Sequence, residues 1–157
     1  MSATREVSPV LPDLALPEAD WADAFEIEIP GRRLSAMEAS RVTLGRVPAW
    51  ARWLLSLRNG LARLAGLKTG PSRQAAKDGT IGMFPILFES PKRVVLGLDD
   101  WHLDFRIVVE VEADGGTGTR LRTTTLVRRK NLFGRLYIGL VSPFHRLIVP
   151  ATLRGAL

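Results

Sequence analysis

The residue types best suited to chemistry lie close together in the segment LGLDDWHLDFRIVVEVE (96–112). Asp100, His102 and Asp104 alternate there, directly after Asp99. A carboxylate beside an imidazole can hold its tautomer and raise its pKa, which general acid–base catalysis requires. His102 with Asp100 or Asp104 is therefore the candidate for an acid–base pair.

The same segment also has the pattern of a strand, and this structural interpretation is the favoured one. Successive side chains of a strand point to opposite faces. Here one face would be apolar and the other largely polar: Leu103, Phe105, Ile107, Val109 and Val111 against His102, Asp104, Arg106, Glu110 and Glu112. Asp99 and Asp100 suit a turn. The chain has two histidines and no HxH or HxxxH pair, so we expect no metal site.

The second histidine, His145, lies in the segment SPFHR (142–146). Ser142 before Pro143 predicts the start of a terminal helix there. If that helix packs on the sheet, His145 would meet His102 in a pocket with two imidazoles. The alternative is that His145 is part of a polar flank of the helix start.

The elements that would position these residues are mainly strands. AFEIEIP (24–30) alternates strictly. From residue 80 on, TIGMFPILFES, KRVVLGLD, HLDFRIVVEVEA and TRLRTTTLVRRKN predict four successive strands. Pro91, Asp99 with Asp100, and DGGTG (114–118) supply the turns. Short turns between consecutive strands predict an antiparallel meander.

Three helices are predicted. Ser35 and Glu38 form a capping-box pattern at the start of a short helix. PAWARWLLSLRNGLARLAG (48–66) predicts a basic amphipathic helix, whose apolar stripe suits either the core or a membrane surface. A polar loop follows at 68–79. Pro150 is expected to kink or shorten the terminal helix.

Composition limits the class of protein. The chain has 157 residues, 46% of them hydrophobic and 24% charged, which fits one globular domain over 21–157 after an irregular arm at 1–20. There is no cysteine and no run of eighteen apolar residues. The N-terminal twenty residues lack the basic and apolar stretches of a signal peptide. We therefore expect a cytoplasmic location.

The charge of +6 is unevenly distributed. Seven acids lie in residues 1–29, whereas the eight Lys and Arg residues after Asp114 are accompanied by no acid. Such a block either attracts phosphate-bearing partners or anionic lipid, or is a solvated face. Nucleic-acid binding is disfavoured because aromatic residues are not interleaved with the basic ones. No nucleotide-binding or serine-hydrolase motif is present, and no cofactor is predicted.

Three stretches carry a resemblance to a known family: PAWARWLLSLRNGLARLAGLK, GLDDWHLDFR and TTTLVRRKNLFGRLYIGLVSPFHRLIV. In their order they resemble the bacterial domain of unknown function 2867 family. That family is similar to the START-like (SRPBCC) helix-grip superfamily. The resemblance implies an α+β fold in which a curved antiparallel sheet wraps around a C-terminal helix and an apolar cavity. A short, proline-containing terminal helix would leave that cavity small or open.

The first functional hypothesis is a protein that binds a small apolar or amphipathic molecule between sheet and helix. The candidate ligand-binding residues are Phe84, Ile86, Phe105, Arg106, Ile107, Thr125, Tyr137, Phe144 and His145. His102, Arg106 or His145 would orient a polar group of the ligand. The alternatives are an enzyme using His102 with Asp100 or Asp104, and a module that binds an anionic membrane through the tryptophan-containing helix. A homodimer formed through an exposed sheet edge is a further possibility.

Overall fold

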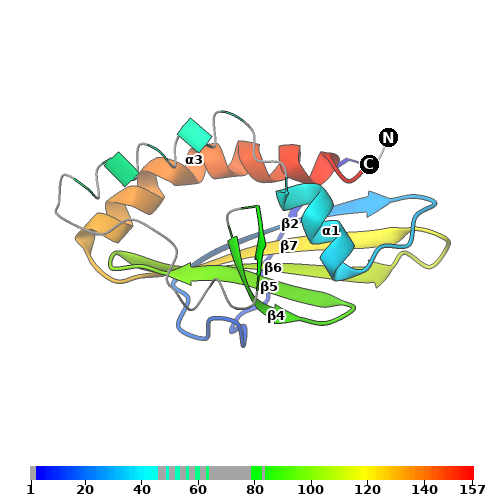
Figure 1. Ribbon diagram of the computed structural model, residues 1–157, viewed down its shortest axis with the longest axis horizontal. Helices are drawn as coiled ribbons and strands as arrows, with labels where there is room; N and C mark the ends of the chain where they lie inside the picture. Colours follow the sequence, from blue (N-terminus) through cyan, green and yellow to red (C-terminus); the bar gives the residue numbers. More distant parts are fainter. Residues whose placement is uncertain are drawn as a thin grey trace.

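The computed structural model describes residues 3–45, 79–82 and 84–157, together with positions 49, 52, 53, 56, 59, 60 and 63. Its centre is an antiparallel sheet of seven strands in the order β1-β2-β7-β6-β5-β4-β3. The strands are β1 (Arg5–Val7), β2 (Trp21–Ile29), β3 (Thr80–Ile81), β4 (Phe84–Glu89), β5 (Arg93–Asp99), β6 (Leu103–Ala113) and β7 (Thr119–Arg129). Two helices, α1 (Ala36–Leu44) and α3 (Leu132–Arg154), lie on one face of this sheet (Figure 1).

The predicted meander is confirmed, with one difference in its first strand. Strands β4 to β7 pair antiparallel in sequence order, and β2 pairs with β7. The segment 80–90 is two strands instead of one, because the chain turns at Gly82, whose φ of 59° is easily adopted by glycine. The α+β fold, an open antiparallel sheet with a C-terminal helix against it, is consistent with a helix-grip layout.

Helix α1 begins where its sequence pattern predicts. Ser35 Oγ accepts a hydrogen bond from the backbone N–H of Glu38, and the Glu38 carboxylate accepts one from the N–H of Ser35. Both bonds satisfy amides that the helix itself leaves free. The segment 48–66 lies largely outside the described residues; its described positions, Arg52 and Trp53 among them, are helical. The predicted loop at 68–79 also lies almost entirely outside them.

The terminal helix is much longer than predicted. A start at Ser142 is wrong, because α3 begins at Leu132, where the Asn131 side chain accepts a hydrogen bond of 3.0 Å from the N–H of Gly134. Pro143 and Pro150 both lie inside the helix and do not end it. A proline costs about 3 kcal/mol in a helix interior, and packing of the inner side of α3 on the sheet offsets that cost.

The main core lies between the sheet and the two helices. Ile27 and Leu121 are at most 1% exposed and pack against α1 and the end of α3. Val149 and Leu153 are the residues that α3 contributes. Burying each such side chain is worth about 1.5–3 kcal/mol, so this end of α3 is firmly attached.

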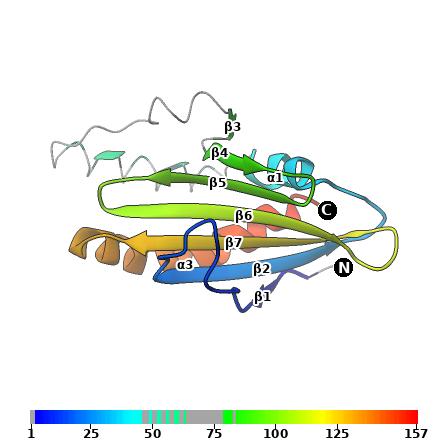
Figure 2. The same ribbon diagram turned by 90° about the horizontal axis from the view of Figure 1, so that it is seen from below.

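The N-terminal arm is not irregular throughout, contrary to prediction. Arg5–Val7 pairs with β2 as an edge strand, and the following residues cross the face of the sheet away from the helices (Figure 2). There Leu16 packs on Val108 and Leu126 in a second apolar cluster. The arm therefore covers part of the outer face.

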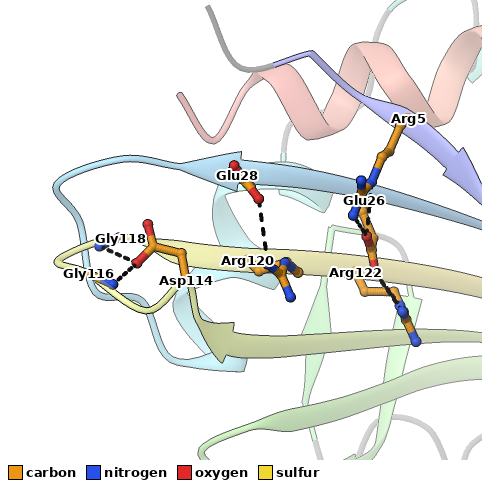
Figure 3. A network of polar contacts seen from close by, with 8 residues as sticks. All are labelled: Arg5, Glu26, Glu28, Asp114, Gly116, Gly118, Arg120 and Arg122. Carbon is orange, nitrogen blue, oxygen red and sulfur yellow. Dashed lines mark hydrogen bonds and ion pairs between the residues drawn. The ribbon is translucent and has the colours of Figure 1, made fainter.

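A charged network ties three strands together on the outer face (Figure 3). The buried Glu26 of β2 accepts hydrogen bonds from Arg5 of β1 at 2.8 Å and from Arg122 of β7 at 2.6 Å. Burial alone raises the pKa of Glu26, but the hydrogen bonds and charges of the two arginines outweigh it and lower the pKa. Nearby, Asp114 closes the turn between β6 and β7 through the N–H groups of Gly116 and Gly118.

Candidate functional site

A histidine–aspartate pair lies between α3 and the sheet. His145, in the middle of α3, has Nδ1 at 2.7 Å from Oδ2 of Asp23 on β2. Its Nε2 is 3.4 Å from Oγ1 of Thr125 on β7. The ring of Trp21 contacts the imidazole edge-on, with centroids 5.7 Å apart. One helix and two strands thus place an acid, an imidazole and a hydroxyl together.

The register of the sheet explains why these residues meet. Asp23 and Thr125 are directly opposite each other in the β2–β7 ladder, and Phe25 is opposite Thr123. Alternation then places Asp23, Thr123 and Thr125 on the helix-facing side together with Phe25. A carboxylate on this largely apolar side is expensive to bury unless it has a partner. His145 supplies that partner for one oxygen.

Two polar atoms beside this pair remain available. Asp23 Oδ1 and Thr123 Oγ1 are buried, and neither has a hydrogen-bond partner among the described residues. Asp23 as a whole is 7% exposed and Thr123 is 4% exposed. Buried polar groups in proteins nearly always have partners, so two of them on the same side of neighbouring strands indicate a place where another molecule or water supplies hydrogen bonds.

The predicted apolar lining lies on the same side of the sheet. Ile107 is directly opposite Thr125 in the β6–β7 ladder. Leu96 of β5 is opposite both Ile107 and Ile86 of β4, so these side chains form a row across the sheet. Phe84 and Phe105 contact edge-on at 5.9 Å. These four side chains are only partly buried, whereas their neighbour Val109 is completely buried. The helix-facing side therefore combines a closed core at one end with a less completely covered apolar surface.

The first candidate, His102, lies in a different environment. It is 2% exposed and its ring is surrounded by those of Trp101, Phe133 and Tyr137 at 5.1–5.6 Å. Its Nδ1 is 3.6 Å from Oδ2 of Asp100. A ring so enclosed has little access to a substrate, and the aromatic contacts instead suit a structural role.

Backbone contacts of His102 and its neighbours support the same interpretation. The carbonyl of His102 accepts a hydrogen bond of 3.0 Å from the N–H of Lys130, and Asn131 Nδ2 donates to the carbonyl of Trp101 at 3.1 Å. Asp104 is turned to Lys130, whose Nζ is 2.7 Å from its Oδ1. These contacts attach the start of α3 to the turn between β5 and β6.

The two histidines belong to separate clusters. Tyr137 contacts His102, and His145 lies eight positions further along α3, which corresponds to about 12 Å at 1.5 Å per residue. The predicted pocket with two imidazoles is therefore not formed. His145 is paired with Asp23 instead of being a polar flank of a helix start.

Two other predicted ligand-binding residues point away from this site. Arg106 alternates onto the outer face and forms an ion pair of 2.7 Å with Asp99. The hydrogen bond from Arg106, opposed in part by burial, lowers the pKa of Asp99. Phe144 is 43% exposed on α3. The structure brings Thr125 and His145 together with the apolar residues, and it leaves Arg106 and Phe144 outside that group.

Sequence reasoning missed Asp23 and Trp21. The predicted strand began at residue 24, whereas β2 begins at Trp21. Extending the alternation backwards would have placed Asp23 on the same face as Phe25, which is the signal that an acid lies on the core side. Its pairing with His145 has no local signal, because the two residues are 122 positions apart.

The outer face carries a groove of about 850 Å³ beneath the N-terminal arm. Its lining includes Arg93, Arg106 and Arg122, and each of these is already paired with a carboxylate. None of the buried, unpartnered side-chain atoms of the described residues lies in this lining. The described residues also contain no group of three or more potential metal ligands. The helix-facing site is therefore the stronger candidate.

Comparison with known proteins defines a family for this α+β chain. The family model of DUF2867, proteins of unknown function, matches residues 15–152, so the chain belongs to that family. The match spans β2, α1, the meander and nearly all of α3. Comparisons with curated proteins and with solved structures return no match.

Proposed function

We propose that this protein binds a small amphipathic molecule between the helix-facing side of the sheet and α3. The observation that carries the proposal is the buried Asp23 Oδ1, which has no donor among the described residues although Oδ2 of the same carboxylate is held by His145. A ligand group that donates a hydrogen bond would satisfy it.

The surroundings define the class of ligand. A carboxylate oxygen only accepts hydrogen bonds, so the polar group of the ligand must present an O–H or N–H. Thr123 Oγ1, which can accept or donate, would contact the same group. The apolar body of the ligand would lie over Phe105 and Ile107, which are partly buried. A few polar groups in an apolar surface are the usual design of a small-molecule site. Membership of the START-like superfamily would agree with such a site.

A second candidate function is acid–base catalysis at the same place. When the Nδ1–H of His145 is donated to Asp23, Nε2 carries the lone pair of a general base. Nε2 lies toward Thr125, on the side of the partly buried apolar residues. This arrangement favours His145 over His102 as the base.

The test is native mass spectrometry of the purified protein, followed by organic extraction and identification of any bound molecule. We expect one apolar molecule carrying a hydroxyl or amino group per chain. Asp23→Asn should lose it. A carboxylate accepts hydrogen bonds at both oxygens, whereas an amide that keeps its oxygen toward His145 would present a donating NH₂ group to the donor of the ligand. The matched control is Glu28→Gln, which removes a charge from the exposed side of the same strand and should retain the ligand.

The two functions give different results with His145→Gln. If binding is the function, this variant retains most of the ligand affinity, and no substrate is turned over by either protein. If catalysis is the function, turnover of the identified molecule is lost. An unliganded mass, with no thermal shift across a panel of lipids and metabolites, would contradict both.

A further inference from the structure

Helix α3 carries a second apolar side that faces away from the sheet. Its members recur at intervals of four and three residues, which places them along one side of a helix. They are Leu132, Leu136, Leu140, Phe144 and Leu147, exposed by 71%, 66%, 59%, 43% and 69%. We call this set the outer stripe of α3. The side that packs on the sheet is a different one, formed by Ile138, Val149 and Leu153.

This pattern is unusual for a helix lying on a sheet. Such helices normally turn polar residues to solvent, whereas α3 is apolar on both sides. By length and composition it is the one helix among the described residues that would suffice to cross a membrane. Only 11% of the 18-residue window of α3 that meets this criterion is buried in the protein. Exposed apolar patches of this kind mark surfaces that contact another molecule or a membrane.

The charges around the outer stripe indicate what would cover it. Arg135, Arg146 and Arg154 are exposed on α3, and none forms an ion pair with a residue that the structure describes. The chain has no acid from residue 115 to its end. A surface of leucines flanked by unpaired arginines is complementary to a layer that is apolar inside and anionic at its surface.

We propose that the outer stripe of α3 docks on the surface of an anionic lipid bilayer, with the helix lying parallel to it. Ile138, Val149 and Leu153 hold the other side of α3 in the fold, so the helix inserts its leucines without leaving the sheet. The three arginines would contact lipid phosphates. This surface differs from residues 48–66, for which membrane binding was one alternative beside a place in the core, and it does not depend on the proposed ligand site.

The test is flotation of the full chain with vesicles of phosphatidylcholine alone or mixed with phosphatidylglycerol. We expect binding only to the mixed vesicles, and weaker binding at high salt because exposed charges are screened. Leu136→Ser with Leu140→Ser should abolish it. The control is Leu14→Ser, since Leu14 is the most exposed leucine of the arm and lies on the opposite face of the sheet.

Charge is tested separately. Arg146→Gln should weaken binding to the mixed vesicles about fivefold, as expected for one basic residue at an anionic surface. Arg41→Gln, an exposed arginine of α1, removes the same charge elsewhere and should change binding much less. Circular dichroism verifies that each variant is folded.

Three results would overturn the proposal. One is absence of binding to the mixed vesicles by the folded wild-type protein. Another is equal binding by wild type and the Leu136→Ser, Leu140→Ser variant. The third is a wild-type dimer in light scattering that the same variant converts to a monomer, because a second copy of the chain would then cover the outer stripe.

Discussion

His145 Nδ1 lies 2.7 Å from Asp23 Oδ2 and joins the middle of α3 to the first part of β2. We predict that the two residues are energetically coupled. His145→Ala leaves a buried carboxylate without its donor, which costs more than the loss of the hydrogen bond itself. A double-mutant cycle with Asp23→Ala, measured by urea unfolding, should give a coupling free energy of about 1–3 kcal/mol.

The pair Glu28 and Arg120 is the control for this cycle. Its atoms are 3.6 Å apart and both side chains are substantially exposed, so its coupling should stay below about 1 kcal/mol. Equal coupling in the two pairs would contradict a special role for His145 and Asp23.

The Glu26 network predicts a loss of stability in acid. Because the pKa of Glu26 is lowered in the folded protein, its contribution is complete above the ordinary pKa of a glutamate. The contribution is lost as the pH falls through the lowered folded-state pKa. Glu26→Gln should cost about 1–3 kcal/mol at neutral pH and should flatten the acid limb of a Tm-against-pH curve. Glu28→Gln should leave that limb nearly unchanged, and equal curves for wild type and Glu26→Gln would refute the prediction.

The close contact between the start of α3 and His102 predicts opposite effects on stability for alanine substitutions at two glycines of this helix. A Cβ at Gly134 would overlap the backbone carbonyl oxygen of His102, whereas one at Gly139 meets nothing within 4 Å. Gly134→Ala should therefore destabilise the fold by about 1–3 kcal/mol. Gly139→Ala should stabilise it by up to about 1 kcal/mol, since alanine favours helix. Thermal unfolding of both variants checks this. An unchanged Tm for Gly134→Ala would contradict the prediction, because the backbone around His102 would then have moved aside at little cost in free energy.

The two sides of α3 predict unequal costs of truncation. Ile138 packs with Leu103 and Val127, so Ile138→Ala should cost about 2–4 kcal/mol. Leu136 lies two positions earlier, on the outer stripe, and is exposed. Leu136→Ala should therefore lower the free energy of unfolding by less than about 0.5 kcal/mol. Urea unfolding of the two variants gives the comparison, and similar costs would mean that Leu136 is covered in solution.

Local patterns predicted most of the sheet. The alternation of β5, β6 and β7 and the turns between them followed from residues such as Ile107, Val109 and the DGGTG segment, because register in a half-buried strand is set by which face is apolar. The capping box at Ser35 was equally local. In contrast, the length of α3 was underestimated, because Pro143 suits the start of a helix and Pro150 its kink or end. In the structure both prolines lie inside one helix, which packs on strands distant in sequence.

The candidate site was harder to predict than the fold for the same reason. His145 was identified from its residue type, but its partner was not, since the contact depends on the antiparallel pairing of β2 with β7. His102 was the more conspicuous histidine in sequence because acids surround it. In the structure two of its three aromatic neighbours, Phe133 and Tyr137, come from α3, and no pattern near His102 in the sequence predicts those two contacts.

The place of β2 in the sheet has a consequence for the order of folding. Strands β4 to β7 are joined by short turns and can pair early, whereas β2 must close a large loop to reach β7; Glu26 and Arg122 are 96 positions apart. Contacts of such long sequence separation form slowly, because the chain loses the entropy of closing the loop before the contacts between the strands stabilise it. We therefore expect β2 to dock late, on a meander that already exists. Asp23 arrives with that strand, so a chain that has completed only its local hairpins would still lack the acid on which the proposed site depends.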